Sequence, residues 1–194
     1  MGGLPAILHN FHPHELWIGN NPPVPAYRML LQEAVDLKIG IRKLHAGDEF
    51  SLGTIAFRTL APNLNYQPGA QPANNDSLVL QARYRDTSIL LAGDAEAPEE
   101  QAMLAQSGLH STLLKVGHHG SLTSTKPQFL AAVDPAWAVI SCGRRNRFGH
   151  PREEILAELQ AAHVRTFRTD LDGVTCFGMD GKTVLVDPMC RGKD

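Results

Sequence analysis

The chain contains no hydrophobic run that is long enough to cross a membrane. A membrane-spanning helix needs about 20 consecutive apolar residues, and no stretch of the 194 residues approaches that length. The first eight residues, MGGLPAIL, include no basic residue and so do not resemble a secretory signal peptide. The sequence therefore predicts a chain that is soluble as given.

Cysteine is scarce, and neither sign of charge dominates. The three cysteines are widely spaced and form no CxxC pair, which argues against a disulfide framework and a zinc ribbon. We expect them to be ordinary buried thiols: Cys142, Cys176 and Cys190. A net charge of -2 provides no strong overall attraction for nucleic acid. Any binding of nucleic acid must therefore be local.

The residues that are present indicate a globular α/β fold. Hydrophobic residues make up 43% of the chain and charged residues 20%. Residues 54–62 are strand-like, with Ile55, Phe57 and Thr59 on one face. Residues 25–40 read as a helix that starts at a proline and stops at a glycine. Similar strand and helix patterns alternate along the rest of the chain. The simplest architecture is a layered sandwich.

Four polar clusters lie beside apolar strands. They are NNDS (residues 74–77), Asp94 after LLAG, the pair His118 and His119 after LLKVG, and RRNRFGHP (residues 144–151). Strand ends at one edge of an α/β sheet are where ligands gather, and a carboxylate with imidazoles is a typical donor set for a divalent metal. Two adjacent histidines can share such a site only if the chain turns there, and the glycine that follows them permits this.

The same segments carry a family resemblance. The series NNDSLVL, ILLAGD, LLKVGHHGS and SCGRRNRFGHP resembles the metallo-β-lactamase-like domain at the C-terminus of ComEC-type DNA-internalisation (competence) proteins. GGLPAIL, RKLHAGDEFSLGTIAFRTLAP and FRTDLDGVTCF fit the same domain, so the resemblance covers almost the whole chain. It implies one α/β domain over residues 1–194, folded as an αββα sandwich.

The resemblance also implies roles for individual residues. Asp94 would be the metal-bridging carboxylate at a centre of divalent metal, manganese or zinc. One of His118 and His119 would be a further ligand, with the choice between them left open. His150 would act with them at the mouth of the site. The chemistry implied is hydrolysis of a phosphodiester. In the family, the implied substrate is the DNA strand that is not taken up. Substrate contacts would come from Asn74, Asn75, Ser121, Arg144, Asn146 and Arg147.

The chain departs from the family at its start. The family's main metal motif reads close to His-x-Asp-x-Asp-His, followed by a hydrophobic residue and GGL, and this chain begins with MGGL. We therefore expect the C-terminal portion of the domain, without its first strands and main metal motif. Two strong ligands fall short of the three that a hydrolytic metal site uses, which predicts weak or no metal binding by this chain alone. Unpaired edges predict marginal stability or self-association.

Two other functions remain open at this point. One is a metallo-hydrolase of another phosphoester, and the other is a non-catalytic remnant or DNA-binding module that uses the arginine-rich loop. The stretch HNFHPH (residues 9–14) has no Asp-His partner after it and is expected to be an exposed loop rather than a metal site. Expected partners are DNA or another phosphodiester, and a membrane channel region from the parent protein or a neighbouring chain. The family's parent proteins are attached to the bacterial cytoplasmic membrane.

Overall fold

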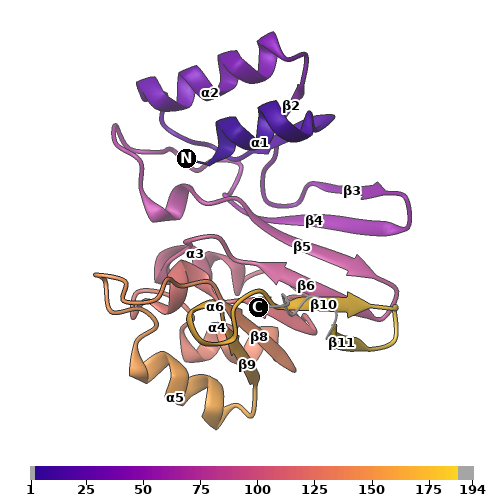
Figure 1. The fold of residues 1–194 in the computed structure, drawn as a ribbon, viewed down its shortest axis with the longest axis vertical. Helices are drawn as coiled ribbons and strands as arrows, with labels where there is room; N and C mark the ends of the chain where they lie inside the picture. Colours follow the sequence, from indigo (N-terminus) through magenta and orange to yellow (C-terminus); the bar gives the residue numbers. More distant parts are fainter. Residues whose placement is uncertain (1–2, 188–194) are drawn as a thin grey trace.

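The computed structural model describes residues 3–187, which form a mixed α/β fold around one large sheet (Figure 1). The helices are α1 (Leu4–Phe11), α2 (Pro25–Asp36), α3 (Ala97–Met103), α4 (Pro127–Val133), α5 (Glu153–Ala161) and α6 (Thr169–Asp172). The strands are β1 (Glu15–Ile18), β2 (Gly40–Lys43), β3 (Glu49–Leu52), β4 (Ile55–Ala61), β5 (Val79–Tyr84), β6 (Thr87–Leu91), β7 (Leu113–Lys115), β8 (Trp137–Ile140), β9 (Arg165–Arg168), β10 (Cys176–Met179) and β11 (Val184–Asp187).

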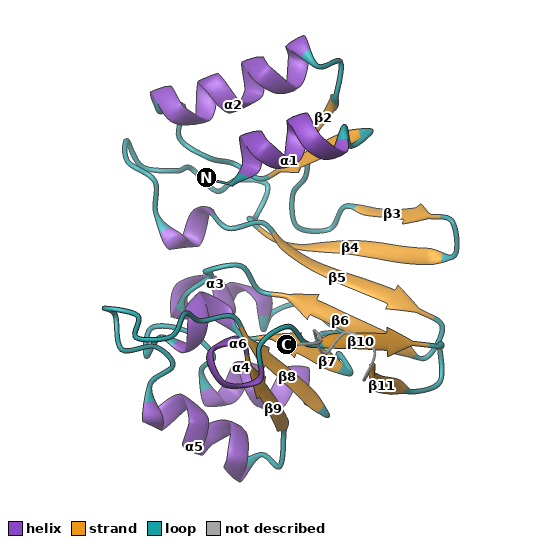
Figure 2. Ribbon diagram, viewed as in Figure 1, coloured by secondary structure: helices purple, strands orange, loops and turns teal. Residues whose placement is uncertain are grey.

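The large sheet has seven strands in the order β3-β4-β5-β6-β7-β8-β9 (Figure 2). Strands β3 to β6 are antiparallel neighbours, whereas β6 to β9 run parallel. The parallel strands are joined through α3, α4 and α5, each of which begins beside a proline or acidic residues that suit a helix N-terminus. These helices pack on one face and build the main core with the strands, through Leu90, Leu114, Ala138, Met103, Phe129 and Ile155 among others.

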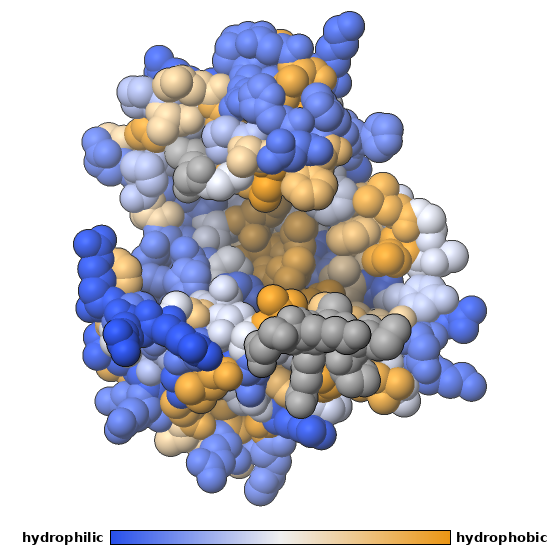
Figure 3. All heavy atoms as spheres, in the orientation of Figure 1, coloured by the Kyte–Doolittle hydropathy of each residue, from blue (hydrophilic) through white to orange (hydrophobic). Residues whose placement is uncertain are grey.

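The opposite face of the large sheet is covered only in part. The parallel pair β1-β2 reaches it through Trp17, whose ring contacts Phe50 and Phe57 edge-on. The antiparallel pair β10-β11 reaches it through Phe177, which packs against Trp137. A hollow with a hydrophobic floor is visible on this side (Figure 3). A cavity of about 310 Å³ on this face is lined by Thr54, Ile55, Phe57, Ala82, Tyr84, Ile89 and Met179.

The predicted α/β class is confirmed, and most predicted strands and helices form. The exposed loop expected over residues 9–14 is wrong in its first half, because α1 continues to Phe11. Leu8 of α1 is buried against Leu30 of α2, and His9 pairs with Glu33 of the same helix. Burial of this apolar face stabilises a helix that the local sequence alone does not indicate. Within residues 3–187, no helix has the length and hydrophobicity to span a bilayer.

The cysteines do not all behave as expected. Cys142 is a free, partly exposed thiol that donates to Asp170 Oδ1 at 3.1 Å. Cys176 is disulfide-bonded, so the expectation of an ordinary thiol is wrong there. Cys190 lies outside the described residues.

Candidate functional site

The topology brings the four polar clusters to one edge of the large sheet. Strands β6, β7 and β8 are parallel, so the segments that follow them leave at the same edge. Strand β5 is antiparallel to β6, so the segment that precedes it starts at this edge too. Residues 74–77, 94–96, 117–121 and 141–151 therefore meet there.

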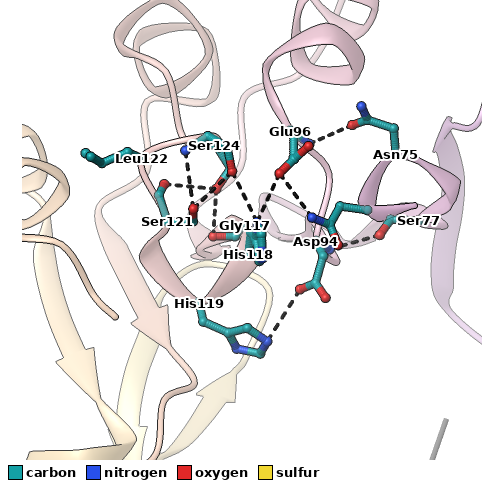
Figure 4. Close-up of polar contacts among 12 residues, drawn as sticks. Asn75, Ser77, Asp94, Glu96, Gly117, His118, His119, Ser121, Leu122 and Ser124 are labelled. Carbon is teal, nitrogen blue, oxygen red and sulfur yellow. Dashed lines mark hydrogen bonds and ion pairs between the residues drawn. The ribbon is translucent and has the colours of Figure 1, made fainter. Parts of the chain in front are cut away.

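Asp94 and His119 face each other across the ends of β6 and β7 (Figure 4). The distance between Asp94 Oδ1 and His119 Nε2 is 3.6 Å. His119 Nδ1 lies 2.7 Å from the backbone oxygen of Ser141, a contact in which this nitrogen must carry the proton and donate it. In the neutral ring, Nε2 then presents its lone pair to the carboxylate. Two such acceptors repel unless a proton or a cation lies between them.

His118 is turned toward a different carboxylate. Its Nδ1 lies 3.3 Å from Glu96 Oε1 and 3.2 Å from Thr123 Oγ1. Burial acts to raise the pKa of Glu96, but hydrogen bonds from Thr123 and Asn74 and the nearby His118 outweigh it, so the pKa is lowered. Glu96 therefore stays ionised and holds His118 in place. The structure thus separates the two histidines, with only His119 directed at Asp94.

A strained turn produces this separation. His118 and His119 both adopt left-handed backbone angles, with φ of 42° and 56°, a conformation that costs about 1–2 kcal/mol per non-glycine residue. Gly120 follows with φ of 81°, and a Cβ there would lie 2.6 Å from Pro151 Cβ. The backbone N–H of Arg152 donates to Gly120 oxygen at 2.9 Å. The histidine turn is therefore packed directly against the end of the 141–151 loop.

The Lys115 side chain connects the ends of β6 and β7. Its Nζ donates to the backbone oxygens of Val116 at 3.1 Å and Gly93 at 3.4 Å. Burial lowers the pKa of Lys115, and the negative charge of Asp94 opposes that shift. On the other side, the backbone N–H of Asp94 donates to Ser77 Oγ at 3.0 Å. These contacts fix where the Asp94 carboxylate can lie.

The 141–151 loop forms the outer wall of the site. Asn146 folds it, because its Oδ1 accepts from the His150 backbone N–H at 3.0 Å and its Nδ2 donates to the His150 backbone oxygen at 2.6 Å. The His150 ring lies 5.7 Å from the His118 ring. Burial lowers the pKa of His150, and the charges of His118, Arg152 and His119 add to that effect. His150 Nδ1 is buried without a hydrogen-bond partner.

Several predicted substrate residues instead have structural contacts. Asn75 Oδ1 accepts from the Glu96 N–H at 2.9 Å, and Asn74 Nδ2 donates to Glu96 Oε1 at 3.0 Å. Ser121 is buried, with its Oγ 3.0 Å from Thr123 Oγ1. Their proposed contacts with substrate remain predictions. Arg144 and Arg147 lie on the exposed part of the loop, where Arg144 Nε donates to the Asp170 backbone oxygen at 3.0 Å.

Sequence reasoning missed two residues of this site, Glu96 and Lys115. Glu96 follows Asp94 by two positions in LLAGDAEAP, which is the only signal that could have marked it. Lys115 stands in the strand LLKVG, where a charged residue among apolar neighbours signals either exposure or a specific buried contact. The contacts of both residues with their partners depend on the turn after each strand.

The donors present fit part of a metal site. Asp94 and His119 offer the right atoms, and ligand atoms around a tetrahedral zinc with bonds of about 2.1 Å are about 3.4 Å apart, close to the observed 3.6 Å. Yet residues 3–187 contain no group of three or more His, Cys, Asp or Glu side chains placed to hold a metal. The described residues therefore supply two donors where a hydrolytic site uses three.

The geometry defines an α/β protein that presents a carboxylate and an imidazole at one edge of its large sheet. Comparison with known proteins identifies its relatives. No protein-family model matches the chain. It is 35% identical over 150 residues to ComE operon protein 3 of Bacillus subtilis. The aligned region covers 77% of this chain and 19% of that protein. It is 37% identical over 108 residues to Competence protein ComA of Neisseria gonorrhoeae, covering 55% and 16%.

A third relative extends the pattern. Recombination protein 2 of Haemophilus influenzae is 35% identical over 114 residues, covering 59% of this chain and 14% of that protein. The chain is therefore homologous to a segment of the competence proteins, as the sequence resemblance predicts, and it spans less than a fifth of the length of these relatives. Among solved structures, a CmlA beta-hydroxylase E377D mutant matches 76% of this chain and 37% of that chain, with 12% identity and a TM-score of 0.47.

Proposed function

We propose that this chain contributes part of the active site of a metal-dependent phosphodiester hydrolase that acts on DNA during its uptake. The observation that carries the proposal is the Asp94–His119 pair. These two metal donors face each other, and the contact of His119 Nδ1 with the Ser141 oxygen holds the imidazole in place. The names of two relatives, Competence protein ComA and Recombination protein 2, support DNA as the substrate.

The residues of this chain have distinct parts in the proposed chemistry. Asp94 and His119 would hold the divalent ion, manganese or zinc, which when bound lowers the pKa of a water molecule and stabilises charge on phosphoryl oxygens. Glu96 and Lys115 position the two strand ends. The lowered pKa of His150 keeps its ring neutral at pH 7, where it can accept a proton beside the substrate. Arg147 on the exposed loop can bind phosphate oxygens.

A second candidate is a DNA-binding module without catalysis. It is favoured by the presence of only two metal donors among the described residues and by the exposed arginines of the 141–151 loop. In that case, binding would weaken steeply with salt, because phosphate contacts release counterions.

Hydrolysis assays of the whole chain separate these candidates. Labelled DNA and bis(p-nitrophenyl) phosphate are incubated with manganese, beside an Asp94→Ala variant. We expect slow, metal-dependent hydrolysis of DNA that the variant loses. Hydrolysis of the small diester alone would point to another phosphoester substrate. Salt-sensitive DNA binding without hydrolysis above the level of the variant would overturn the hydrolase proposal and support the binding module.

A further inference from the structure

Phe148 is an exposed aromatic residue beside the site. Its side chain is 59% exposed, and its ring is nearly parallel to that of His150, with an interplanar angle of 13° and centroids 6.1 Å apart. A single exposed apolar residue is ordinary on a protein surface. What sets Phe148 apart is the loop that carries it and the groups around its ring.

The loop around Phe148 is tied on both sides. Asn146 binds both the backbone N–H and the backbone oxygen of His150, and its Nδ2 also donates to the Gly143 oxygen at 3.0 Å. Arg144 ties the loop to the segment after β9 through the Asp170 oxygen. Phe148 is thus presented from an ordered backbone, which reduces the entropy that a ligand must remove on binding.

Positive charge lies close to the same ring. The Cζ atom of Arg147 lies 5.1 Å from the Phe148 ring centroid, and Arg145 is exposed two positions earlier in the chain. The strongly hydrophilic colour in Figure 3 gathers where this loop projects in Figure 1. An aromatic face combined with guanidinium groups offers stacking and phosphate contacts together, the combination that binds single-stranded nucleic acid.

A cavity brings Phe148 and His119, the partner of Asp94, to the same hollow. Phe148, His150 and His119 line the same hollow of about 280 Å³. The Nε2 atom of His119 lies 3.6 Å from Asp94 Oδ1. A phosphodiester held near His119 would therefore place a neighbouring base of the same strand within reach of Phe148.

We propose that Phe148 and Arg147 form a stacking platform for an unpaired nucleobase, so that the site takes single-stranded nucleic acid in preference to duplex. In a duplex, bases are paired and stacked inside the helix and their faces are covered, whereas every unpaired base offers a free face. This inference deepens the proposed function by naming the form of the substrate, and it rests on that function for the position of the phosphate.

Binding without metal tests the platform separately from hydrolysis. The whole chain is titrated into a fluorescein-labelled single-stranded oligonucleotide in EDTA, and anisotropy is recorded. The same strand with abasic positions, and its duplex, serve as comparison ligands. The variants are Phe148→Ala, Phe148→Tyr, and Phe11→Ala as a matched control, because Phe11 is 77% exposed on α1, away from this loop.

We expect Phe148→Ala to weaken binding of the single strand by about 10- to 100-fold, the usual loss when a base-stacking aromatic is removed. Binding of the abasic strand and of the duplex should change little, and Phe148→Tyr and Phe11→Ala should bind as the unmodified chain does. Equal losses on the intact and abasic strands, an affinity of Phe148→Ala equal to that of Phe11→Ala, or no binding of the single strand by the unmodified chain would each overturn the platform.

The outcome also remains separate from that of the hydrolase proposal. Stacking-dependent binding in EDTA, together with no manganese-dependent cleavage, would keep the platform and remove the hydrolase. Cleavage that depends on Asp94, together with DNA binding that does not depend on Phe148, would keep the hydrolase and remove the platform.

Discussion

The helix-covered face of the large sheet and the N-terminal layer, which consists of α1, β1, α2 and β2, bury very different numbers of apolar residues. The first is a continuous core under α3, α4 and α5, whereas the second rests on four buried residues, Leu8, Leu30, Ala34 and Ile39. The segments that carry Asp94 and His119 leave from strands of the large core. The N-terminal layer carries neither residue, although it supplies most of the lining of a cavity of about 290 Å³ that reaches Asp94. Site geometry is thus set by the region with most buried contacts, where local opening is rarest.

The largest expected effect comes from a cavity in the large core. Leu114 of β7 is fully buried, and Leu114→Ala should lower the free energy of unfolding by about 4–5 kcal/mol, since the surrounding strands and helices cannot collapse onto the space. Leu8→Ala removes the same atoms from the N-terminal layer and should cost only about 2–3 kcal/mol. Urea unfolding measures both. A loss for Leu8→Ala as large as that for Leu114→Ala would erase the difference between the regions.

A glycine pair tests the link between the histidine turn and the 141–151 loop. Gly120→Ala adds a Cβ 2.6 Å from Pro151 Cβ at a left-handed φ, and should destabilise the chain by about 3 kcal/mol through overpacking and backbone strain. Gly53→Ala is the matched control, with a positive φ but nothing within 4 Å, and should cost about 1 kcal/mol. Thermal unfolding would compare them, and equal shifts in Tm would show that the turn is not packed as described.

The sequence was sufficient for the elements with strong local patterns. Strand β4 forms where Ile55, Phe57 and Thr59 were placed on one face of a strand, and α2 begins at Pro25 as predicted. Helix α1 could not be predicted, because its stability comes from the packing of Leu8 on α2 rather than from the helix propensity of its residues. The choice between His118 and His119 was also beyond the sequence. It depends on two left-handed residues and on the Ser141 oxygen, which is close only after folding.

The smallest expected effect concerns the anchor of the 141–151 loop. Arg168 hydrogen-bonds Asp170 and holds the pKa of that carboxyl at about 2, against some opposition from burial. Because the folded-state pKa lies below the ordinary value of 3.8, the pair stabilises the fold above pH 3.8, and this stability is lost as the pH falls toward 2. Arg168→Gln should raise the pKa of Asp170 toward its ordinary value and change the free energy of unfolding at pH 7 by under about 1 kcal/mol.

An NMR titration of the Asp170 carboxyl carbon checks this assignment. An unchanged midpoint in Arg168→Gln would mean that another group holds the charge. Loosening of the 141–151 loop in the same variant would appear as faster amide exchange there, without a change in β6 or β7.

The central claim is that His119, and not His118, shares a metal with Asp94. Titration calorimetry with Mn²⁺ and Zn²⁺ on the unmodified chain and on Asp94→Ala, His119→Ala and His118→Ala tests it directly. We predict weak binding by the unmodified chain, no binding by the Asp94 and His119 variants, and retained binding by the His118 variant. Binding that survives in His119→Ala but disappears in His118→Ala, or binding that is equal in all four proteins, would contradict the account.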